Sequence, residues 1–544
     1  MLHETVLYLL VIGLFSLIHT REKYDFILSV AITGFVSLVF FFFILDYRVG
    51  YDSAQTYLLD HEQSGNIKLE IISSLQNYVL IFPFFVSTIL ALLNNIIFRY
   101  ETQKKAVAGF FVLNLVSFIM LIAGNNFVQI ITFVLIIDIL SQLLIHDRNA
   151  GKRYSLYNFA ADMGLFLVLA MLQGKLSNLD IGNISHYYET GRHRDFIMFV
   201  VMASLSVKFG FFLFQGYWLD LKSAKFHNLY FLPYLSTPMA ALILFVKFYP
   251  LLVVSPSFLP VLNIMVALTM LWGGIWAILN PQIKEKFVYC NMLNIAFLVK
   301  LIEKSNFLWN VHFSNILILL FIFNLCLYYL HYEIDRNHAK DKLSLYFVLA
   351  AFVADIIALS MQIIDLYTKS HFLIIISFAA LFLCVMTYMF YQVGLKLKGE
   401  FSFRQNDYRT IFIMSLLICI CYIFGKTELS RCWPICFVLV SFIVLCHIHS
   451  FAFLQPRENL RSKLQNIDLF GLIYQRLIVD PIKHTGVAFN LLTDFIFLER
   501  TISPMVSKVN SALIKTYRHM SRLGMIYYLL CTIMGILLAI CLFY

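Results

Sequence analysis

Apolar segments long enough to cross a lipid bilayer recur along almost the whole sequence. A hydrocarbon core about 30 Å thick requires roughly 20 predominantly apolar residues per helix, and about sixteen segments meet this requirement. They centre near residues 11, 35, 88, 115, 136, 164, 206, 241, 269, 294, 320, 356, 382, 416, 443 and 533. The sequence therefore predicts an all-α, polytopic membrane protein. The first segment lacks a basic stretch and a small-residue cleavage site, so we expect it to remain as a helix.

Composition and charge support this class. Hydrophobic residues make up 60% of the chain and charged residues only 13%, whereas about a quarter of the residues in ordinary globular domains are charged. The formal net charge of +10 is compatible with a nucleic-acid partner, but the distribution of the basic residues along the chain indicates membrane topology instead. We therefore expect the lipid bilayer as a partner and no nucleic acid.

Basic residues collect in alternate loops between the predicted spans. The loops that fall on one side under the sixteen-helix count contain Arg21, Lys23, Arg99, Lys104, Lys105, Arg148, Lys152, Arg153, Lys222, Lys225, Lys284, Lys286, Arg336, Lys340, Lys342, Lys396, Lys398, Arg404 and Arg409. By the positive-inside rule this side is cytoplasmic. The N-terminus and the loops 46–76 and 173–195 then face the opposite compartment.

Two ionisable residues interrupt the apolar spans. Lys208 lies within SLSVKFGFFLFQGYW and Asp138 within ITFVLIIDILSQLLI. A charged side chain in the bilayer costs roughly 3 kcal/mol on insertion scales, so such residues usually mark the path of an ion or a proton. Lys208 can also extend its ammonium to an interface. The pattern favours an ion-conducting protein over a soluble enzyme.

No cofactor or metal site is expected from the sequence. The ten cysteines form no C-x-x-C pair and no zinc-type set with histidine, and the sequence contains no glycine-rich dinucleotide fingerprint in a strand–helix context. Cys446, His447 and His449 are close in sequence but spread over different faces of a helix end. We expect neither cofactor nor metal, and any electron transfer would be carried out by other subunits.

The C-terminal part contains a second type of helix. From about 468 to 522, apolar residues recur at three- and four-residue spacing, with Pro481 and Pro504 as the breakers. This pattern predicts an amphipathic helix too polar to span, about 80 Å long at 1.5 Å per residue. We expect it to run along the membrane surface before the last spanning helix, from Gly524 to Phe543.

Several motifs resemble one family. KFGFFLFQGYWLD resembles the segment of antiporter-like subunits in which a helix with an essential Lys breaks before Gln, an aromatic residue and Asp; the matching residues are Lys208, Gln215, Tyr217 and Asp220. AILNPQIKEKFVYCN matches the next helix start at Lys284 and Tyr289, and DLYTKS places Lys369 at a second helix break. With the long surface helix, the chain is similar to the antiporter-like L subunit of proton-pumping NADH:quinone oxidoreductase (respiratory complex I), related to Mrp-type cation/proton antiporters.

The resemblance implies a proton path through Lys208, Asp138, Lys369, Lys284, Asp162 and His312. Asn126, Asn158, Asp162 and His312 match family positions, but several do not. The family has an acid on the fifth helix at the position that Leu135 occupies here. Asp138 lies one turn away, and we expect it to face Lys208 through water. The other family positions with apolar replacements are Phe159, Pro233, Ile316 and Leu320.

The resemblance also implies an organisation and a function. The expected regions are helices one to three in 1–105, two inverted five-helix repeats in 106–253 and 258–393, helices fourteen and fifteen in 394–467, the lateral helix in 468–522 and the final span in 523–544. The function implied is that of a non-redox membrane subunit of an NADH:quinone oxidoreductase-type translocase, partnered by other hydrophobic subunits in the bacterial inner or mitochondrial inner membrane. An Mrp-type antiporter subunit and a non-pumping structural paralogue remain alternatives.

Overall fold

The computed structural model describes residues 2–335 with short gaps. The gaps are residues 19–24, 50–53, 61–67, 98–106, 146, 174–178, 182–191, 222–230, 233–234, 254, 280–282 and 305–310. The chain divides into two compact units, Met1–Ile467 and Asp468–Tyr544, and all described residues belong to the first. The predicted lateral helix, the last five predicted spans and Lys369 lie outside the described residues.

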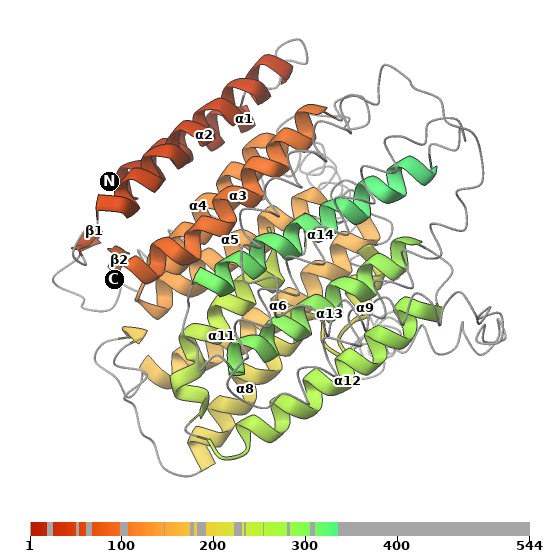
Figure 1. Cartoon of the computed structure of the whole chain (residues 1–544). Coiled ribbons are helices and arrows are strands. Elements are labelled where there is room, and N and C mark those ends of the chain that lie inside the picture. The colour runs from red at the N-terminus through yellow and green to blue at the C-terminus, as the bar shows by residue number, and fades with distance from the viewer. Residues whose placement is uncertain are drawn as a thin grey trace, which may run out of the picture. The chain divides into compact units, whose positions relative to one another are not determined.

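Long helices form nearly all of the described structure (Figure 1). They are α1 (Leu2–Ile18), α2 (Asp25–Val49), α3 (Leu75–Ile97), α4 (Val107–Ala123), α5 (Phe127–Leu144), α6 (Arg148–Gln173), α8 (Arg192–Phe209), the short α9 (Gly216–Asp220), α11 (Thr237–Val253), α12 (Phe258–Leu279), α13 (Ile283–Lys304) and α14 (Val311–Asp335). Each predicted span centre from residue 11 to residue 320 lies inside one of these helices. The polytopic helical fold expected from hydropathy is therefore present.

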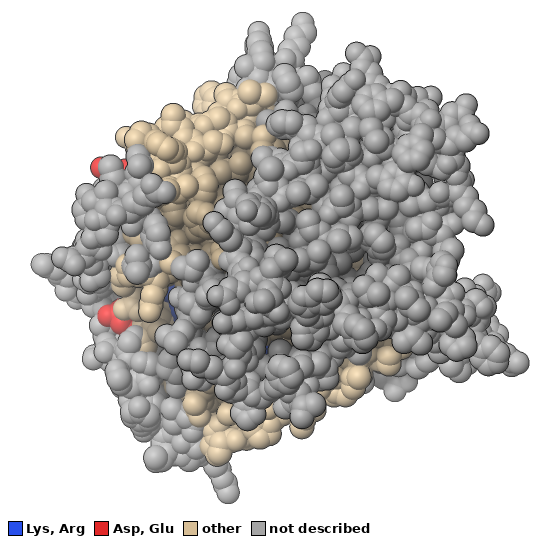
Figure 2. All heavy atoms as spheres, viewed as in Figure 1, with Lys and Arg blue, Asp and Glu red and all other residues tan. Residues whose placement is uncertain are grey.

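Several helices are suited to cross a membrane. Among the described residues, four helical stretches have both the length and the apolarity required: Gln76–Asn94, Phe127–Leu144, Asn149–Gln173 and Phe258–Ala277. Shorter apolar stretches lie in α1, α2, α4, α11 and α14. Apolar side chains also cover much of the described surface, such as Phe199 on α8 and Ile264 on α12, which is 60% exposed. In Figure 2, charged side chains are few on the described surface.

A small β-hairpin was not predicted from the sequence. β1 (Ala54–Asp60) and β2 (Lys68–Ser73) pair in antiparallel orientation, with Ala54 opposite Ser73 and Asp60 opposite Lys68. From the sequence, this segment was expected only to be a polar loop between two spans. Alternation within so short a stretch is a weak signal, and two strands are marginal without a further layer to pack on.

The described helices pack side by side. α1 packs on α4, α4 on α5, α5 on α6 and α6 on α8, while α11 contacts both α5 and α8. α4 and α1 approach closely at Gly109 of α4, where a Cβ would lie 1.9 Å from the Ser16 hydroxyl of α1. This packing places the middle of α5 and α6, the end of α8 and the start of α11 around one point, where several buried polar residues gather.

Candidate functional site

The helix that carries Lys208 ends one residue later. α8 stops at Phe209, and Gly210 adopts the left-handed conformation with φ 64°. The amide of Gly210 donates to the carbonyl of Val207 and that of Phe211 to Ser206, which is the Schellman pattern of a helix C-terminus. A Cβ at position 210 would lie 2.2 Å from the Trp218 ring. The break that the family resemblance implied after Lys208 is therefore present, and glycine is required there.

Two side chains that follow the break form hydrogen bonds with backbone groups near the end of α8. The Tyr217 hydroxyl lies 3.0 Å from the carbonyl oxygens of both Val207 and Lys208 and donates to them. The amide of Leu213, itself at φ 80°, donates to Gln215 Oε1 at 2.8 Å. Unpaired helix-end carbonyls are costly when buried. Gln215 and Tyr217 thus hold the irregular backbone that follows Lys208.

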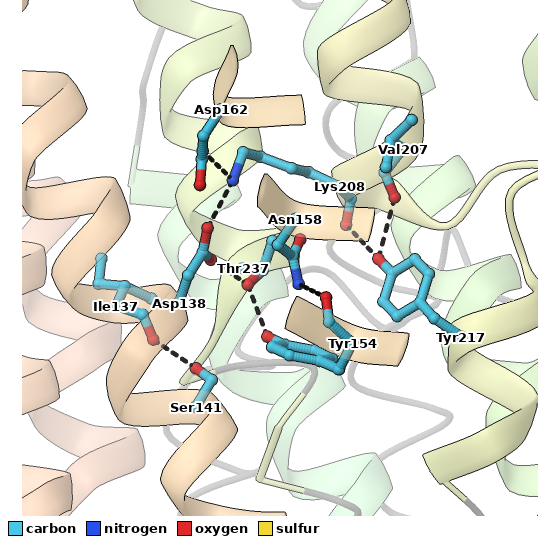
Figure 3. A network of polar contacts seen from close by, with 10 residues as sticks. All are labelled: Ile137, Asp138, Ser141, Tyr154, Asn158, Asp162, Val207, Lys208, Tyr217 and Thr237. Carbon is cyan, nitrogen blue, oxygen red and sulfur yellow. Dashed lines mark hydrogen bonds and ion pairs between the residues drawn. The ribbon is translucent and has the colours of Figure 1, made fainter. Parts of the chain in front are cut away.

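The Lys208 ammonium lies between two carboxylates (Figure 3). Its Nζ is 2.6 Å from Asp138 Oδ2 on α5 and 2.6 Å from Asp162 Oδ1 on α6. Lys208 is 0% exposed, and both acids are buried. We refer to Lys208, Asp138 and Asp162 as the charge cluster. Its three members come from three helices, so a relative movement of these helices changes the contacts of the ammonium.

A chain of hydroxyl groups continues from the charge cluster. Thr237, the first residue of α11, donates a short hydrogen bond to Asp138 Oδ1. The Thr237 hydroxyl lies 2.6 Å from that of Tyr154 on α6. Asn158 Nδ2 in turn donates to the Tyr154 carbonyl at 3.0 Å, one turn along the same helix. Figure 3 shows this chain ending at the carboxylate that faces Lys208.

The charge balance of the cluster is suited to proton chemistry. Ionised together, one ammonium and two carboxylates carry one net negative charge. Removing charges from water is expensive, and a buried charge without compensation is strongly destabilising. A site of this kind can lower its net charge by taking up a single proton and can release it when the contacts change. Either carboxylate is able to hold that proton, because the ammonium already carries all its hydrogens.

The structure corrects the expected distance between Asp138 and Lys208. The sequence favoured a contact through water, because Asp138 lies one turn from the family position at Leu135. The side chains instead touch directly at 2.6 Å, and the carboxylate of Asp138 is buried while Leu135 is partly exposed. The acid therefore lies one turn along α5 from the family position and still contacts the lysine.

The structure shows the side-chain contacts of some of the other predicted residues but not of all. Asp162, which matches a family position, contacts Lys208. Lys284 lies in α13 and His312 in α14, but their side-chain surroundings fall outside the description. Lys247 of α11 is partly buried and donates to the Gly124 carbonyl between α4 and α5.

Three of the replaced family positions have clear surroundings. The side chain of Phe159 is 59% exposed and therefore points away from the charge cluster, so this replacement leaves the cluster intact. Ile316 and Leu320 are both fully buried in α14. Their apolar side chains occupy the helix on which the resemblance implied further titratable residues.

The roles of Tyr154 and Thr237 in the site were not predicted from the sequence. A signal for Tyr154 was available, because Tyr154, Asn158 and Asp162 follow one another at four-residue spacing and share one face of α6. Thr237 follows a segment broken by proline and offers no periodic pattern of its own. Its partners Asp138 and Tyr154 are 99 and 83 residues away in sequence, so only the folded chain reveals the contact.

Comparison with known families gives a match over the part of the chain that carries the cluster. The family model described as NADH:quinone oxidoreductase/Mrp antiporter, TM, matches residues 113–369. One curated relative is NADH-ubiquinone oxidoreductase chain 5 of Paramecium tetraurelia, 25% identical over 229 residues. That match covers 39% of this chain and 40% of the relative, so the chain spans less than half of the relative's length in the matched region.

Solved structures with a similar fold are membrane assemblies. A chain of the Mrp complex from Dietzia sp. superposes with a TM-score of 0.65 at 12% identity, over 96% of this chain and 63% of that one. A chain of respiratory complex I from Thermus thermophilus gives 0.61 at 11% identity, over 78% and 99%. A chain of the membrane-bound sulfane sulfur reductase, an archaeal respiratory membrane complex, gives 0.62 at 15%, over 94% and 99%. At these identities the likeness shows the fold.

Proposed function

We propose that this antiporter-like, multi-pass membrane protein, related over residues 113–369 to the NADH:quinone oxidoreductase/Mrp antiporter family, is a membrane subunit of an NADH:quinone oxidoreductase-type complex. In that complex it takes part in proton translocation coupled to electron transport. The partners are other hydrophobic subunits, and the location is the bacterial inner or the mitochondrial inner membrane. The chain has about sixteen spans, in keeping with the hydropathy pattern, and two inverted five-helix repeats are among them.

One observation carries the proposal: a lysine with no exposure to solvent touches two aspartates from different helices. A structural ion pair needs one acid, whereas here the lysine has two. Intramembrane ionisable groups are costly and mark ion or proton paths by default. In this path the ammonium releases its proton when a carboxylate moves away and regains it when the contact re-forms. Lys208 is the central station.

Further stations are assigned by the family resemblance. Lys284 on α13, His312 on α14 and Lys369 beyond the described residues continue the path through the second repeat. Ile316 and Leu320 leave an apolar stretch on α14, which the proton crosses only with the help of water or of a neighbouring helix. Single replacement of Lys284, His312 or Lys369 by an uncharged residue of similar size would identify which of them the path uses.

The test is proton uptake by membrane vesicles that contain the complex. Replacing Lys208 by Met keeps much of the side-chain volume and removes the ammonium, so NADH-driven acidification should be lost. Lys208→Arg should also fail, because a guanidinium does not release its proton in the physiological range. Glu4→Gln, at an exposed acid of α1, serves as the control and should pump normally. Normal acidification by Lys208→Met vesicles would refute the proposal.

An Mrp-type antiporter subunit is the second candidate. The observation that favours it is the likeness to a chain of the Mrp complex over 96% of this chain. The two candidates differ in what drives the proton. Vesicles without an electron donor, given a pulse of sodium chloride, would show proton movement in the antiporter and none in the redox-driven subunit.

A structural paralogue without transport is the third candidate, favoured by the buried Ile316 and Leu320 of α14. In this case the charge cluster is a remnant. The assembly would then need the chain to form, and its proton transport would be the same with Lys208 intact or replaced by Met.

A further inference from the structure

The hydroxyl chain beyond the charge cluster has a defined direction. Asp138 accepts from Lys208 at Oδ2 and from Thr237 at Oδ1. A threonine hydroxyl has one hydrogen, and Thr237 uses it for Asp138. The contact of 2.6 Å between Thr237 and Tyr154 is then made by the tyrosine hydrogen. Tyr154 therefore donates to Thr237, which donates to Asp138, and the chain is polarised toward the carboxylate.

The hydroxyl chain leads to one side of the protein. On α6, residues 163–172 beyond Asp162 carry no polar side chain, whereas Asn158 and Tyr154 lie on the other side of it, toward Arg153 and the exposed Lys152. On α11, residues 238–246 are all apolar, and at 1.5 Å per residue they separate Thr237 from Lys247 by about 15 Å. Polar groups thus connect the charge cluster only toward the basic start of α6, within the described helices α6 and α11.

Both hydroxyl groups belong to buried side chains. Thr237 is 0% exposed and the Tyr154 ring is buried. The Tyr154 ring packs edge-on against Tyr217, the residue that closes the helix break after Lys208. The backbone beside Tyr154 is tied to α9 by an ion pair between Arg153 and Asp220 at 2.9 Å. These contacts hold the two hydroxyls in line with Asp138.

We propose that Tyr154 and Thr237 form the hydroxyl link through which Asp138 exchanges protons with water on the side of the membrane that bears the basic start of α6. A proton from water bonds to the Tyr154 oxygen, and the tyrosine hydrogen passes to the Thr237 oxygen. The threonine hydrogen passes to Asp138 Oδ1. One proton enters and one reaches the carboxylate, and each hydroxyl keeps one hydrogen. The link resets when both hydroxyls rotate back.

This inference rests on the proposed function, and the experiment separates the two. NADH-driven acidification is measured in vesicles and divided by the amount of the chain in the assembled complex. Thr237→Val replaces the hydroxyl by a methyl group of similar size and should slow transport per copy about ten-fold or more, because it removes a positioned proton donor. Thr237→Ser retains a hydroxyl and should stay within about three-fold of the unmodified chain.

Matched variants separate proton transfer from packing. Tyr154→Phe should slow transport as Thr237→Val does, since it keeps the ring and removes the hydroxyl. Tyr329→Phe removes another buried hydroxyl, which donates to Asn94 at 2.8 Å, and should leave transport per copy unchanged. Equal failure of the Ser and Val variants at position 237 would assign a packing role to Thr237 and overturn the inference.

The Lys208→Met variant distinguishes failure of the hydroxyl link from failure of the proposed function. If Lys208→Met abolishes transport while Thr237→Val and Tyr154→Phe pump at the unmodified rate per copy, the hydroxyl link is refuted and the proposed function stands. If Lys208→Met also pumps normally, the proposed function itself fails. If Thr237→Val does not assemble, the comparison of Tyr154→Phe with Tyr329→Phe decides the question alone.

Discussion

Either aspartate of the charge cluster should suffice to neutralise Lys208, and this predicts a strongly non-additive pair of mutations. Asp138→Asn leaves the ammonium 2.6 Å from Asp162, and Asp162→Asn leaves it 2.6 Å from Asp138. Each single variant thus retains one neutral ion pair. The double variant leaves a fully buried ammonium without an acid among its described contacts.

The magnitude follows from the cost of an uncompensated buried charge. Removing the partner of a buried ion pair typically destabilises by about 3–5 kcal/mol. Each single variant should cost no more than about 1 kcal/mol, in line with the loss of one hydrogen bond whose partner keeps another. The expected coupling between the two mutations is therefore at least about 1 kcal/mol, above the few tenths of a kcal/mol expected for independent sites.

The assay is the fraction of the chain that remains monodisperse in detergent after heating, followed by size-exclusion chromatography with a fluorescent tag. The singles should lose their fold slightly below the temperature of the unmodified chain, and the double well below it. Adding Lys208→Met to the double variant removes the isolated charge and should restore stability. Additive losses, or no rescue by Lys208→Met, would refute the reasoning.

Three further predictions follow from the break, the loops and the family. Gly210→Ala should abolish assembly, because position 210 has φ 64° and a Cβ there would lie 2.2 Å from Trp218; an immunoblot of the assembled complex measures this, and normal assembly would contradict the geometry. Cysteine labelling should find loop 46–76 reactive from outside the cytoplasm and loops 328–344 and 457–467 protected; labelling of all three from one side would break the sixteen-span topology. Gentle solubilisation and mass spectrometry should recover other hydrophobic antiporter-like subunits, whereas a lone homodimer would argue for the antiporter candidate.

The positions of the helices could be read from the sequence because hydropathy reports burial in lipid over windows of about twenty residues. That signal is strong and local, and each predicted centre up to residue 320 falls inside a helix. The hairpin of β1 and β2 gave no comparable signal, because it is short and lies in a polar segment. The helix break after Lys208 was accessible through the family motif.

The site was only partly accessible. Lys208 and Asp138 stood out because a charge within an apolar run is rare. Their direct contact was not predictable, because it depends on the rotation of α5 relative to α8, and a shift of one turn along a helix changes both depth and direction. Thr237 was missed for a related reason: its partners are far away in sequence, and a threonine near prolines most often indicates a helix start.

The most direct test of the central claim is the number of protons translocated per NADH oxidised, measured in the same vesicles with Lys208 intact and as Met. Proton uptake is followed by a pH-sensitive dye and NADH by its absorbance, so electron transfer and pumping are separated. If Lys208 carries the proton, NADH oxidation continues in the Lys208→Met complex while the ratio of protons to NADH falls. An unchanged ratio at full assembly would contradict the account, since the proton would then move without the lysine between Asp138 and Asp162.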